Sequence, residues 1–462
     1  MNNISKANKQ IVPPKILTWL ISGAFFMQMI DSTILNTALP DVAKSLGEEP
    51  LEMQSIIVAY MLTVAFLLPL SGWISDRIGA KNAFLSAIII FTTGSACCAY
   101  SSTMTELVIS RVFQGIGGSL MVPVGRLIVL RIYPKKDFVK VLSFILLPAS
   151  LGPILGPPLG GFLAEYLSWH WIFLINIPIG IITFMLAKIK MPYIEKEEIE
   201  KFDWLGFFAF SIAVIMIILS SSQTKIVEFS LQAKFLMFGM ALLLLAFFWF
   251  HINRSKHPLF HVALLKVPSF RVGLIGNMFS RLGFSAMPLL IPLLLQVGLG
   301  FSPSKSGLYI LVIGVFSVIG RFKVSQLVNK LGFRLVLIFN TIAVGMVILC
   351  FSFIDIETKP YVIFIILAML GIVNSIQFSS MNSLTLIDLP KKFSAEGNSL
   401  LSVVMQVCVT LGISTSATML NFFESSSNID TLNAFRYTFL VMGCATILSS
   451  ASFLFTPRDA GK

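Results

Sequence analysis

Charged side chains are scarce in this chain, and their scarcity excludes a soluble globular protein. Asp, Glu, Lys and Arg make up 12% of the 462 residues, whereas soluble domains carry about 25%. Hydrophobic residues make up 56%, and the mean hydropathy is +0.87. The composition therefore predicts an all-α polytopic membrane protein.

Histidine and cysteine are also rare, and their positions argue against an enzyme or a metal centre. The four histidines are His170, His251, His257 and His261, and the five cysteines are Cys97, Cys98, Cys350, Cys408 and Cys444. The histidines lie near the ends of apolar runs, without a Ser/His/Asp or metal-ligand grouping. The cysteines lie inside apolar runs, with neither disulfide nor metal spacing, and we interpret them as packing residues.

Long apolar runs fill most of the chain. Fourteen of them are long enough to cross a bilayer, which takes about 20 residues, and polar or Pro/Gly-bearing connectors separate them. The predicted spans are 17–39, 52–73, 83–100, 104–131, 138–164, 171–187, 204–222, 232–251, 270–296, 304–328, 333–353, 360–385, 395–422 and 435–455.

Lys and Arg give the chain a net charge of +12, but they gather in alternate connectors rather than in a nucleic-acid-binding patch. With a cytoplasmic amino terminus, 23 of the 34 Lys and Arg residues fall in cytoplasmic segments, six outside and five within spans. Because cytoplasmic loops carry an excess of Lys and Arg, we expect both termini to be cytoplasmic. The first span lacks a small-residue cleavage site and is too long for a signal-peptide core, so we expect it to be retained.

An internal repeat indicates two related halves. The loop 72–81 after the second span matches a segment after the tenth, and transporter halves are often duplicated. The corresponding pairs are Asp76 and Asn329, Arg77 and Lys330, Gly79 and Gly332, and Lys81 and Arg334. We therefore predict an amino-terminal six-helix half at 1–190, a linker with two inserted transmembrane helices at 191–265, and a carboxy-terminal six-helix half at 266–462.

A single carboxylate, Asp31, lies deep within the first span. A charge at that depth costs roughly 2.5–3.5 kcal/mol on insertion scales, so it requires water or a partner. Gln28, Ser32 and Asn36 recur at three- or four-residue spacing and share a helix face with Asp31. We expect this face to line a cavity. The alternative is an acid held by a neighbouring backbone for structure alone.

Arg111 in the fourth span is the predicted partner of Asp31. At about 1.5 Å per residue, Asp31 lies roughly 13 Å and Arg111 roughly 10 Å below the same membrane surface. An intact ion pair would keep Asp31 ionised, and a broken pair would favour its protonation. The pair is thus a candidate proton switch, and a permanent structural ion pair is the alternative.

Four motifs occur in the order typical of one transporter group. They are the first-span run 31–40, the loop 72–81, the fourth-span run 107–119 and the fifth-span run 152–161. On these motifs the chain is identified as a member of the major facilitator superfamily. It resembles the fourteen-span drug:proton antiporters, closest to the branch of multidrug resistance protein D, and the resemblance covers nearly the whole chain.

The resemblance implies a role for each motif. Asp31 and Arg111 would couple transport to protons, and the residues Gly72, Asp76, Arg77, Gly79 and Lys81 would form a cytoplasmic gate. In that gate we expect Asp76 to accept hydrogen bonds from the start of another helix. The fifth-span motif is associated with export, and its members are Gly152, Pro153, Gly156, Pro157 and Gly160.

Three positions depart from the family pattern. Ala80 replaces a common cation, and Asn329 leaves the second copy of the loop without its acid. His170 stands where Arg is usual, and we interpret it as an interfacial anchor beside two tryptophans or as a pH-sensitive group.

The carboxy-terminal half adds polar residues to the predicted cavity. Arg281 lies near mid-depth in the ninth span, where a cation requires an acid, water or a ligand. Polar residues also occur in the twelfth and thirteenth spans, although such side chains often only join helices. The predicted substrate cavity comprises Gln28, Asn36, Gln114, Arg281, Asn374, Gln377 and Gln406.

These observations predict a proton-coupled antiporter that exports small organic compounds by alternating access. The chain lacks a Gly-x-x-x-x-Gly-Lys-Ser/Thr run, so we expect the proton gradient to drive transport and no cofactor to take part. The expected partners are a small-molecule substrate, protons and the lipid bilayer, with no nucleic acid.

By resemblance we expect a bacterial inner-membrane location, and an envelope-spanning efflux partner is left open. The alternative is a specific exporter of an organic anion, siderophore or metal chelate, because one acid, Asp31, faces the cations Arg111 and Arg281. A purely structural or sensor protein would leave Asp31 and Arg111 without a purpose.

Overall fold

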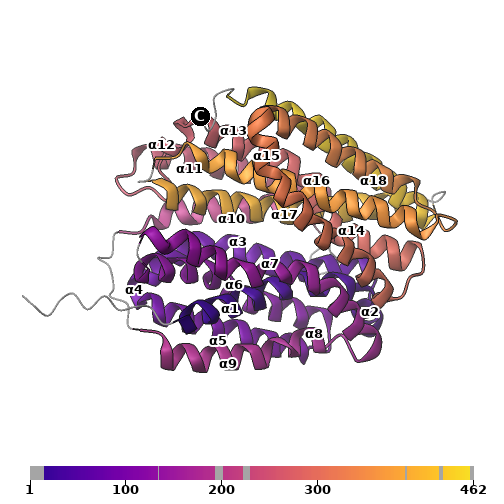
Figure 1. The fold of residues 1–462 in the computed structure, drawn as a ribbon, viewed down its shortest axis with the longest axis horizontal. Helices are drawn as coiled ribbons and strands as arrows, with labels where there is room; N and C mark the ends of the chain where they lie inside the picture. The colour runs from indigo at the N-terminus through magenta and orange to yellow at the C-terminus, as the bar shows by residue number, and fades with distance from the viewer. Residues whose placement is uncertain are drawn as a thin grey trace, which may run out of the picture.

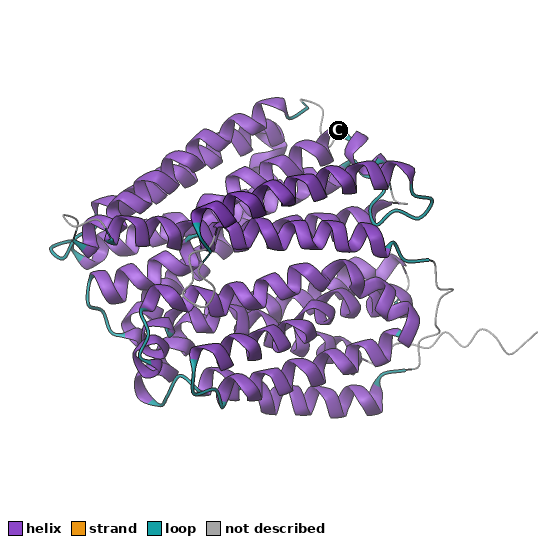
Figure 2. Cartoon of the chain, turned by 180° about the vertical axis from the view of Figure 1, so that it is seen from behind, coloured by secondary structure: helices purple, strands orange, loops and turns teal. Residues whose placement is uncertain are grey.

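The computed structural model describes residues 15–133, 135–192, 201–221, 229–390, 393–425 and 430–457. Within these ranges the chain is helical and contains no strand. The helices run alongside one another in two bundles that lie side by side, as both views show (Figures 1 and 2). The all-α fold class predicted from the sequence is confirmed.

The first bundle is built from the amino-terminal helices. They are α1 (Lys15–Ile34), α2 (Leu39–Leu46), α3 (Gln54–Leu67), α4 (Ser71–Ile78), α5 (Ala80–Ala99), α6 (Met104–Ile132), α7 (Lys135–Tyr166), α8 (Trp171–Leu174) and α9 (Asn176–Lys190). Helix α1 packs along α7, whereas α6 packs along α3 and α5. The short 3-10 turn η1 (Leu35–Thr37) joins α1 to α2.

The second bundle is built from the carboxy-terminal helices. They are α12 (Ala263–Lys266), α13 (Pro268–Ser285), α14 (Met287–Leu293), α15 (Pro303–Cys350), α16 (Pro360–Ile387), α17 (Ser394–Glu424) and α18 (Thr431–Ser449), followed by the 3-10 turn η7 (Ser450–Phe455). Helix α13 packs against α16, α17 and α18.

Two glycines make equivalent turns in the two bundles. Gly79 separates α4 from α5 with φ 90°, and Gly332 bends α15 with φ 75°. Glycine populates positive φ at little cost because it has no Cβ. These are corresponding positions of the predicted repeat. The predicted spans 304–328 and 333–353 therefore lie in two helices that meet at Gly332 and together make up α15.

Helices α10 (Trp204–Ser221) and α11 (Leu231–Arg254) pack against each other. Helix α10 also contacts α3 of the first bundle and α17 of the second, and Ser211 donates a hydrogen bond to the Phe66 carbonyl over 3.4 Å. The two helices correspond to the predicted insertion, although parts of its connectors lie outside the described residues. The division at 190 and 266 stays a prediction.

Ten helices in the described part of the chain are long and apolar enough to cross a membrane. One of these, Pro303–Phe353, covers two predicted spans, and Trp204–Ser220 forms a shorter apolar helix. Helices α1 and α7 are not among the ten. Polytopic membrane character is confirmed, while the count of fourteen spans stays a prediction.

The two bundles meet closely at the end of the molecule that carries α2, which we call the α2 end; the opposite end, with the turn at Gly79, is the α4 end (Figure 1). At the α2 end, Gln296 Nε2 donates to the Thr37 carbonyl over 2.7 Å. The Ser304 amide donates to Glu165 over 2.9 Å. Gly161 of α7 lies directly against the Pro303 carbonyl of α15. The α2 end is therefore closed.

We predict that Gly161→Val opens the α2 end. A Cβ at this position would overlap the Pro303 backbone, and overpacking of this kind costs roughly 1–3 kcal/mol. Pulsed electron resonance between spin labels at Tyr100→Cys and Ile356→Cys, both exposed on opposite bundles, should show a longer distance population. Gly239→Val is the control, because nothing lies within 4 Å of its Cβ position. An unchanged distance distribution in Gly161→Val would contradict the closure described here.

Candidate functional site

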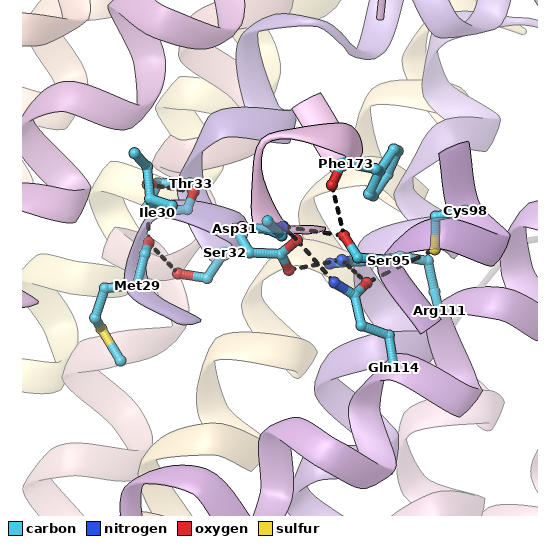
Figure 3. Close-up of polar contacts among 11 residues, drawn as sticks. Met29, Ile30, Asp31, Ser32, Thr33, Ser95, Cys98, Arg111, Gln114 and Phe173 are labelled. Carbon is cyan, nitrogen blue, oxygen red and sulfur yellow. Dashed lines mark hydrogen bonds and ion pairs between the residues drawn. The ribbon is translucent and has the colours of Figure 1, made fainter. Parts of the chain in front are cut away.

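Asp31 and Arg111 form a buried ion pair between α1 and α6. Arg111 Nη1 lies 2.8 Å from Asp31 Oδ2, and the two side chains are 2% and 1% exposed. Figure 3 shows the two side chains pointing toward each other between the helices. The structure thus brings together Asp31 and Arg111, which the sequence predicts to lie at similar depths in the membrane.

Two amides complete the surroundings of the Asp31 carboxylate. Gln114 Nε2 and Asn176 Nδ2 each donate to Asp31 Oδ1 over 2.9 Å. Arg111 Nη1 also donates to Gln114 Oε1 over 2.7 Å, so the two donors on α6 support each other. Three side chains from α6 and α9 therefore donate hydrogen bonds to the Asp31 carboxylate.

Asn176 was not among the predicted site residues. Its second amide hydrogen is directed to Ser95 Oγ at 3.1 Å, and Ser95 donates to the Phe173 carbonyl over 2.9 Å. Asn176 is fully buried at the start of α9. The sequence offered a polar residue three positions after the aromatic run 169–173, in a segment 176–178 similar to the family, but neither signal identifies a partner.

Aromatic rings surround the Arg111 guanidinium. Its Cζ lies 4.3 Å from the centre of the Tyr60 ring and 5.8 Å from that of Phe173. Cation–π contacts are strengthened where water is excluded. The cation therefore keeps favourable contacts that do not depend on the charge of Asp31.

Two residues assigned to the substrate cavity instead join helices in this structure. Gln114 is fully buried on Asp31, and Gln28 donates from Nε2 to the Gly118 carbonyl of α6 over 3.0 Å. This corrects the expectation of an open polar face. Asn36 is buried in η1, where the chain leaves the α-helix that carries Asp31.

The predicted gate residues bind within their own bundle. Asp76 pairs with Arg131 at the end of α6 over 2.6 Å, so its partner is a cation and not the start of another helix. Lys81 donates to the Met191 carbonyl after α9 over 2.6 Å, and Arg77 lies over the Trp73 ring. The Cβ position of Gly72 is open. The expected partner of Asp76 is thus corrected.

The fifth-span glycines bring α7 against α1. Gly152, Gly156 and Gly160 face Met29, Thr33 and Ile34, at distances that leave no room for a Cβ. Thr33 donates to the Gly152 carbonyl over 3.2 Å, and Thr37 donates to the Pro157 carbonyl over 2.9 Å. Pro153 and Pro157 lie inside α7, and their missing amides leave carbonyls of the preceding turn without an intrahelical donor.

A second polar cluster lies in the other bundle, around Arg281. This side chain is 9% exposed, its Nε donates to Asn277 over 2.9 Å, and its Cζ lies 4.8 Å from the Phe378 ring. Its Nη2 is buried without a hydrogen-bond partner in the described structure. Asn374 and Gln377 line the same small pocket.

The remaining predicted cavity residues do not meet at one point. Gln377 is held by Thr341 and Asn340 of α15 over 2.7 Å and 2.9 Å. Gln406 of α17 is not among the residues that line the Arg281 pocket. In this conformation the Asp31 network lies in one bundle and the Arg281 pocket in the other, and a single substrate cavity stays a prediction.

His170 lies at the α2 end, between α7 and α8. Its ring stacks on Trp169 with centres 3.8 Å apart, and Nδ1 lies 2.6 Å from Ser168 Oγ. Partial burial lowers the pKa of His170. The imidazole is consequently neutral at pH 7, which fits an aromatic anchor in neutral medium.

The model of the Major Facilitator Superfamily matches residues 21–413. The chain belongs to this superfamily. Among its relatives, the "Putative multidrug resistance protein MdtD" of Pectobacterium atrosepticum is 42% identical over 96% of each chain. The protein of that name from Salmonella typhimurium is 42% identical over 96% of this chain and 94% of its own. These matches also confirm the branch to which the motifs pointed.

Solved structures of other transporters share the fold at low sequence identity. The D-xylose–proton symporter covers 96% of this chain and 98% of its own, with a TM-score of 0.69 and 14% identity. A peptide transporter of the POT family covers 95% and 96%, with a TM-score of 0.73 and 13% identity. The protein is therefore a polytopic membrane transporter with the major facilitator fold and not an enzyme.

We predict that Asp31 and Arg111 are energetically coupled. Removing one partner of a buried ion pair costs roughly 3–5 kcal/mol because the other charge stays uncompensated. Arg111→Met and Asp31→Asn should each lower the unfolding midpoint in detergent, and the double variant should be more stable than the sum of the two losses implies. Strictly additive losses would mean that the pair contributes no coupling energy.

Proposed function

We propose that this transporter is a proton-coupled antiporter that exports small organic compounds of the multidrug type from the bacterial cytoplasm. The observation that carries the proposal is the Asp31 network, an ionisable acid buried with donors from two helices. An acid at that depth marks a proton or substrate path in membrane proteins. The name of the MdtD relatives supports the drug substrates.

The geometry around Asp31 indicates how a proton would be exchanged. Arg111 contacts Oδ2, whereas both amides contact Oδ1. A proton arriving at Oδ2 would displace only the guanidinium, which retains Tyr60 and Gln114 as contacts. Protonation would remove the cross-helix charge attraction while α1 keeps its two amide bonds. One proton moving down 100 mV supplies about 2.3 kcal/mol to drive the cycle.

Alternating access would then consist of rocking one bundle against the other. With the α4 end placed in the cytoplasm by the excess of Lys and Arg, both termini are cytoplasmic and the closed α2 end faces outward. The Gln296 and Glu165 hydrogen bonds would have to break for release. An envelope-spanning efflux partner, included in the proposal, would carry substrates onward from there.

We predict that Asp31→Asn abolishes coupling. In vesicles containing the purified protein, adding substrate should release protons from the wild type but not from Asp31→Asn, because the amide takes up no proton. Asp355→Asn is the matched control, since Asp355 lies at the α2 end and its hydrogen bonds within the described part of the chain go to Thr358. The candidate substrates added in this assay are lipophilic cations, neutral drugs and organic anions. If Asp31→Asn retains substrate-induced proton release, the proposed proton site is wrong.

A second candidate function is export of an organic anion, siderophore or metal chelate. It is favoured by the unpaired Nη2 of Arg281, because a buried cation without an acid is costly unless a ligand supplies the opposite charge. The ring of Phe378 and the amides of Asn374 and Gln377 would surround such a ligand.

For this candidate we predict that Arg281→Gln selectively weakens transport of anions. Loss of a charge-assisted hydrogen bond, worth roughly 1.5–3 kcal/mol, should raise the KM for organic anions at least tenfold while leaving lipophilic cations within about twofold. The KM values for organic anions and for lipophilic cations are measured in the same vesicle preparation. Equal losses for anions and cations would assign Arg281 to structure instead.

A further inference from the structure

A groove outside the transport path lies between α13 and α18. It is lined by Pro268, Arg271, Val272, Ile275, Phe279, Leu282, Ala445, Leu448, Ser449, Ala451, Ser452 and Phe455. Its volume is about 870 Å³, near the upper end of the roughly 300–1,000 Å³ of small-molecule sites. In Figure 1 the described chain ends close to α12 and α13, at the α4 end.

The groove lies on an exposed apolar side of α13, away from the Arg281 pocket. Arg271, Ile275, Phe279 and Leu282 are spaced four, four and three residues apart and therefore share one face of α13. The buried side chain of Arg281 lies on the other side of this helix, in its own pocket. Large apolar side chains on the groove side stay exposed, with Leu448 at 75% and Phe455 at 80%.

Arg271 is the one charged residue among those that line this mostly apolar groove. Arg271 lies one turn into α13 and is exposed, and its side chain has no hydrogen-bond or ion-pair partner among the described residues. From Pro268 to Leu282 the groove follows α13 for about 21 Å at 1.5 Å per residue. It thus runs from the membrane surface at the α4 end to beyond the midplane of a core about 30 Å thick.

We propose that this groove binds an anionic diacyl phospholipid from the leaflet at the α4 end. The headgroup phosphate contacts Arg271, and one acyl chain lies along Ile275, Phe279 and Leu448. Basic sites between transmembrane helices select anionic headgroups by charge, and an apolar channel of this length fits an extended chain. The placement in the inner leaflet rests on the proposed orientation, whereas the charge selectivity does not.

The test measures lipid binding to the purified full-length protein by native mass spectrometry. Phosphatidylglycerol and phosphatidylethanolamine with identical acyl chains are titrated separately, and inorganic phosphate is added as a competitor. The wild type should bind one phosphatidylglycerol in preference to phosphatidylethanolamine. Phosphate at the same concentration should not displace it, because the acyl chain contributes most of the contact area.

Four variants locate the site. Arg271→Gln should weaken phosphatidylglycerol about fivefold, the ratio expected for one cation at an anionic surface. Arg254→Gln should leave binding unchanged, because Arg254 is also an exposed cation but lies at the end of α11, outside the groove. Ala445→Trp should weaken both lipids by filling the inner end. Arg271→Lys, which keeps the charge, should restore most of the preference.

Several results would overturn the proposal. Equal affinity of the wild type for the two lipids would show ordinary annular lipid, and equal effects of Arg271→Gln and Arg254→Gln would remove the site from the groove. Displacement by inorganic phosphate would indicate a headgroup contact alone. A lipid-independent dimer that Ala445→Trp abolishes would identify a second copy of the chain as the occupant.

Discussion

The buried carboxylate of Asp31 is the constraint on which the first bundle depends. Removing an ion from water costs several kcal/mol even after the surroundings relax, and only well-placed donors offset that cost. Arg111, Gln114 and Asn176 supply them from α6 and α9. Three helices are thereby fixed around one side chain, and α1 cannot shift without losing hydrogen bonds. Because the glycine stripe of α7 leaves no gap beside α1, a displacement of α1 must also be absorbed by α7 and by its contact with α15.

Sequence reasoning succeeded where a geometric rule has only one outcome. The similar depths of Asp31 and Arg111 followed from a fixed rise per residue in antiparallel spans, and the correspondence of Gly79 and Gly332 followed from the repeat. It failed where several partners were equally compatible with the pattern. Asp76 could pair with any cation or helix start at its end of the bundle, and the packing of α4 on α6 selected Arg131.

The cavity was harder to predict for a related reason. Polar side chains in a membrane helix either line water or join helices, and sequence spacing does not distinguish the two. Gln28 joins helices because its amide reaches the Gly118 carbonyl, which depends on how closely α1 and α6 approach. That distance is set by small residues on both helices and by the conformer of the transporter. Neither the approach of the two helices nor the conformer of the transporter can be derived from the spacing of the polar residues.

The buried cations of the two bundles, Arg111 and Arg281, have different surroundings. Arg111 has a carboxylate at 2.8 Å, whereas Arg281 has one amide, one ring face and an unpaired Nη2. The two copies of the repeat share their backbone turns but not their charges, because Asn329 occupies the position that corresponds to Asp76. A cation left short of partners is costly in lipid and is retained only where a ligand or water offsets that cost in part of the cycle. This asymmetry supports a division in which the first bundle exchanges the proton and the second contacts the substrate.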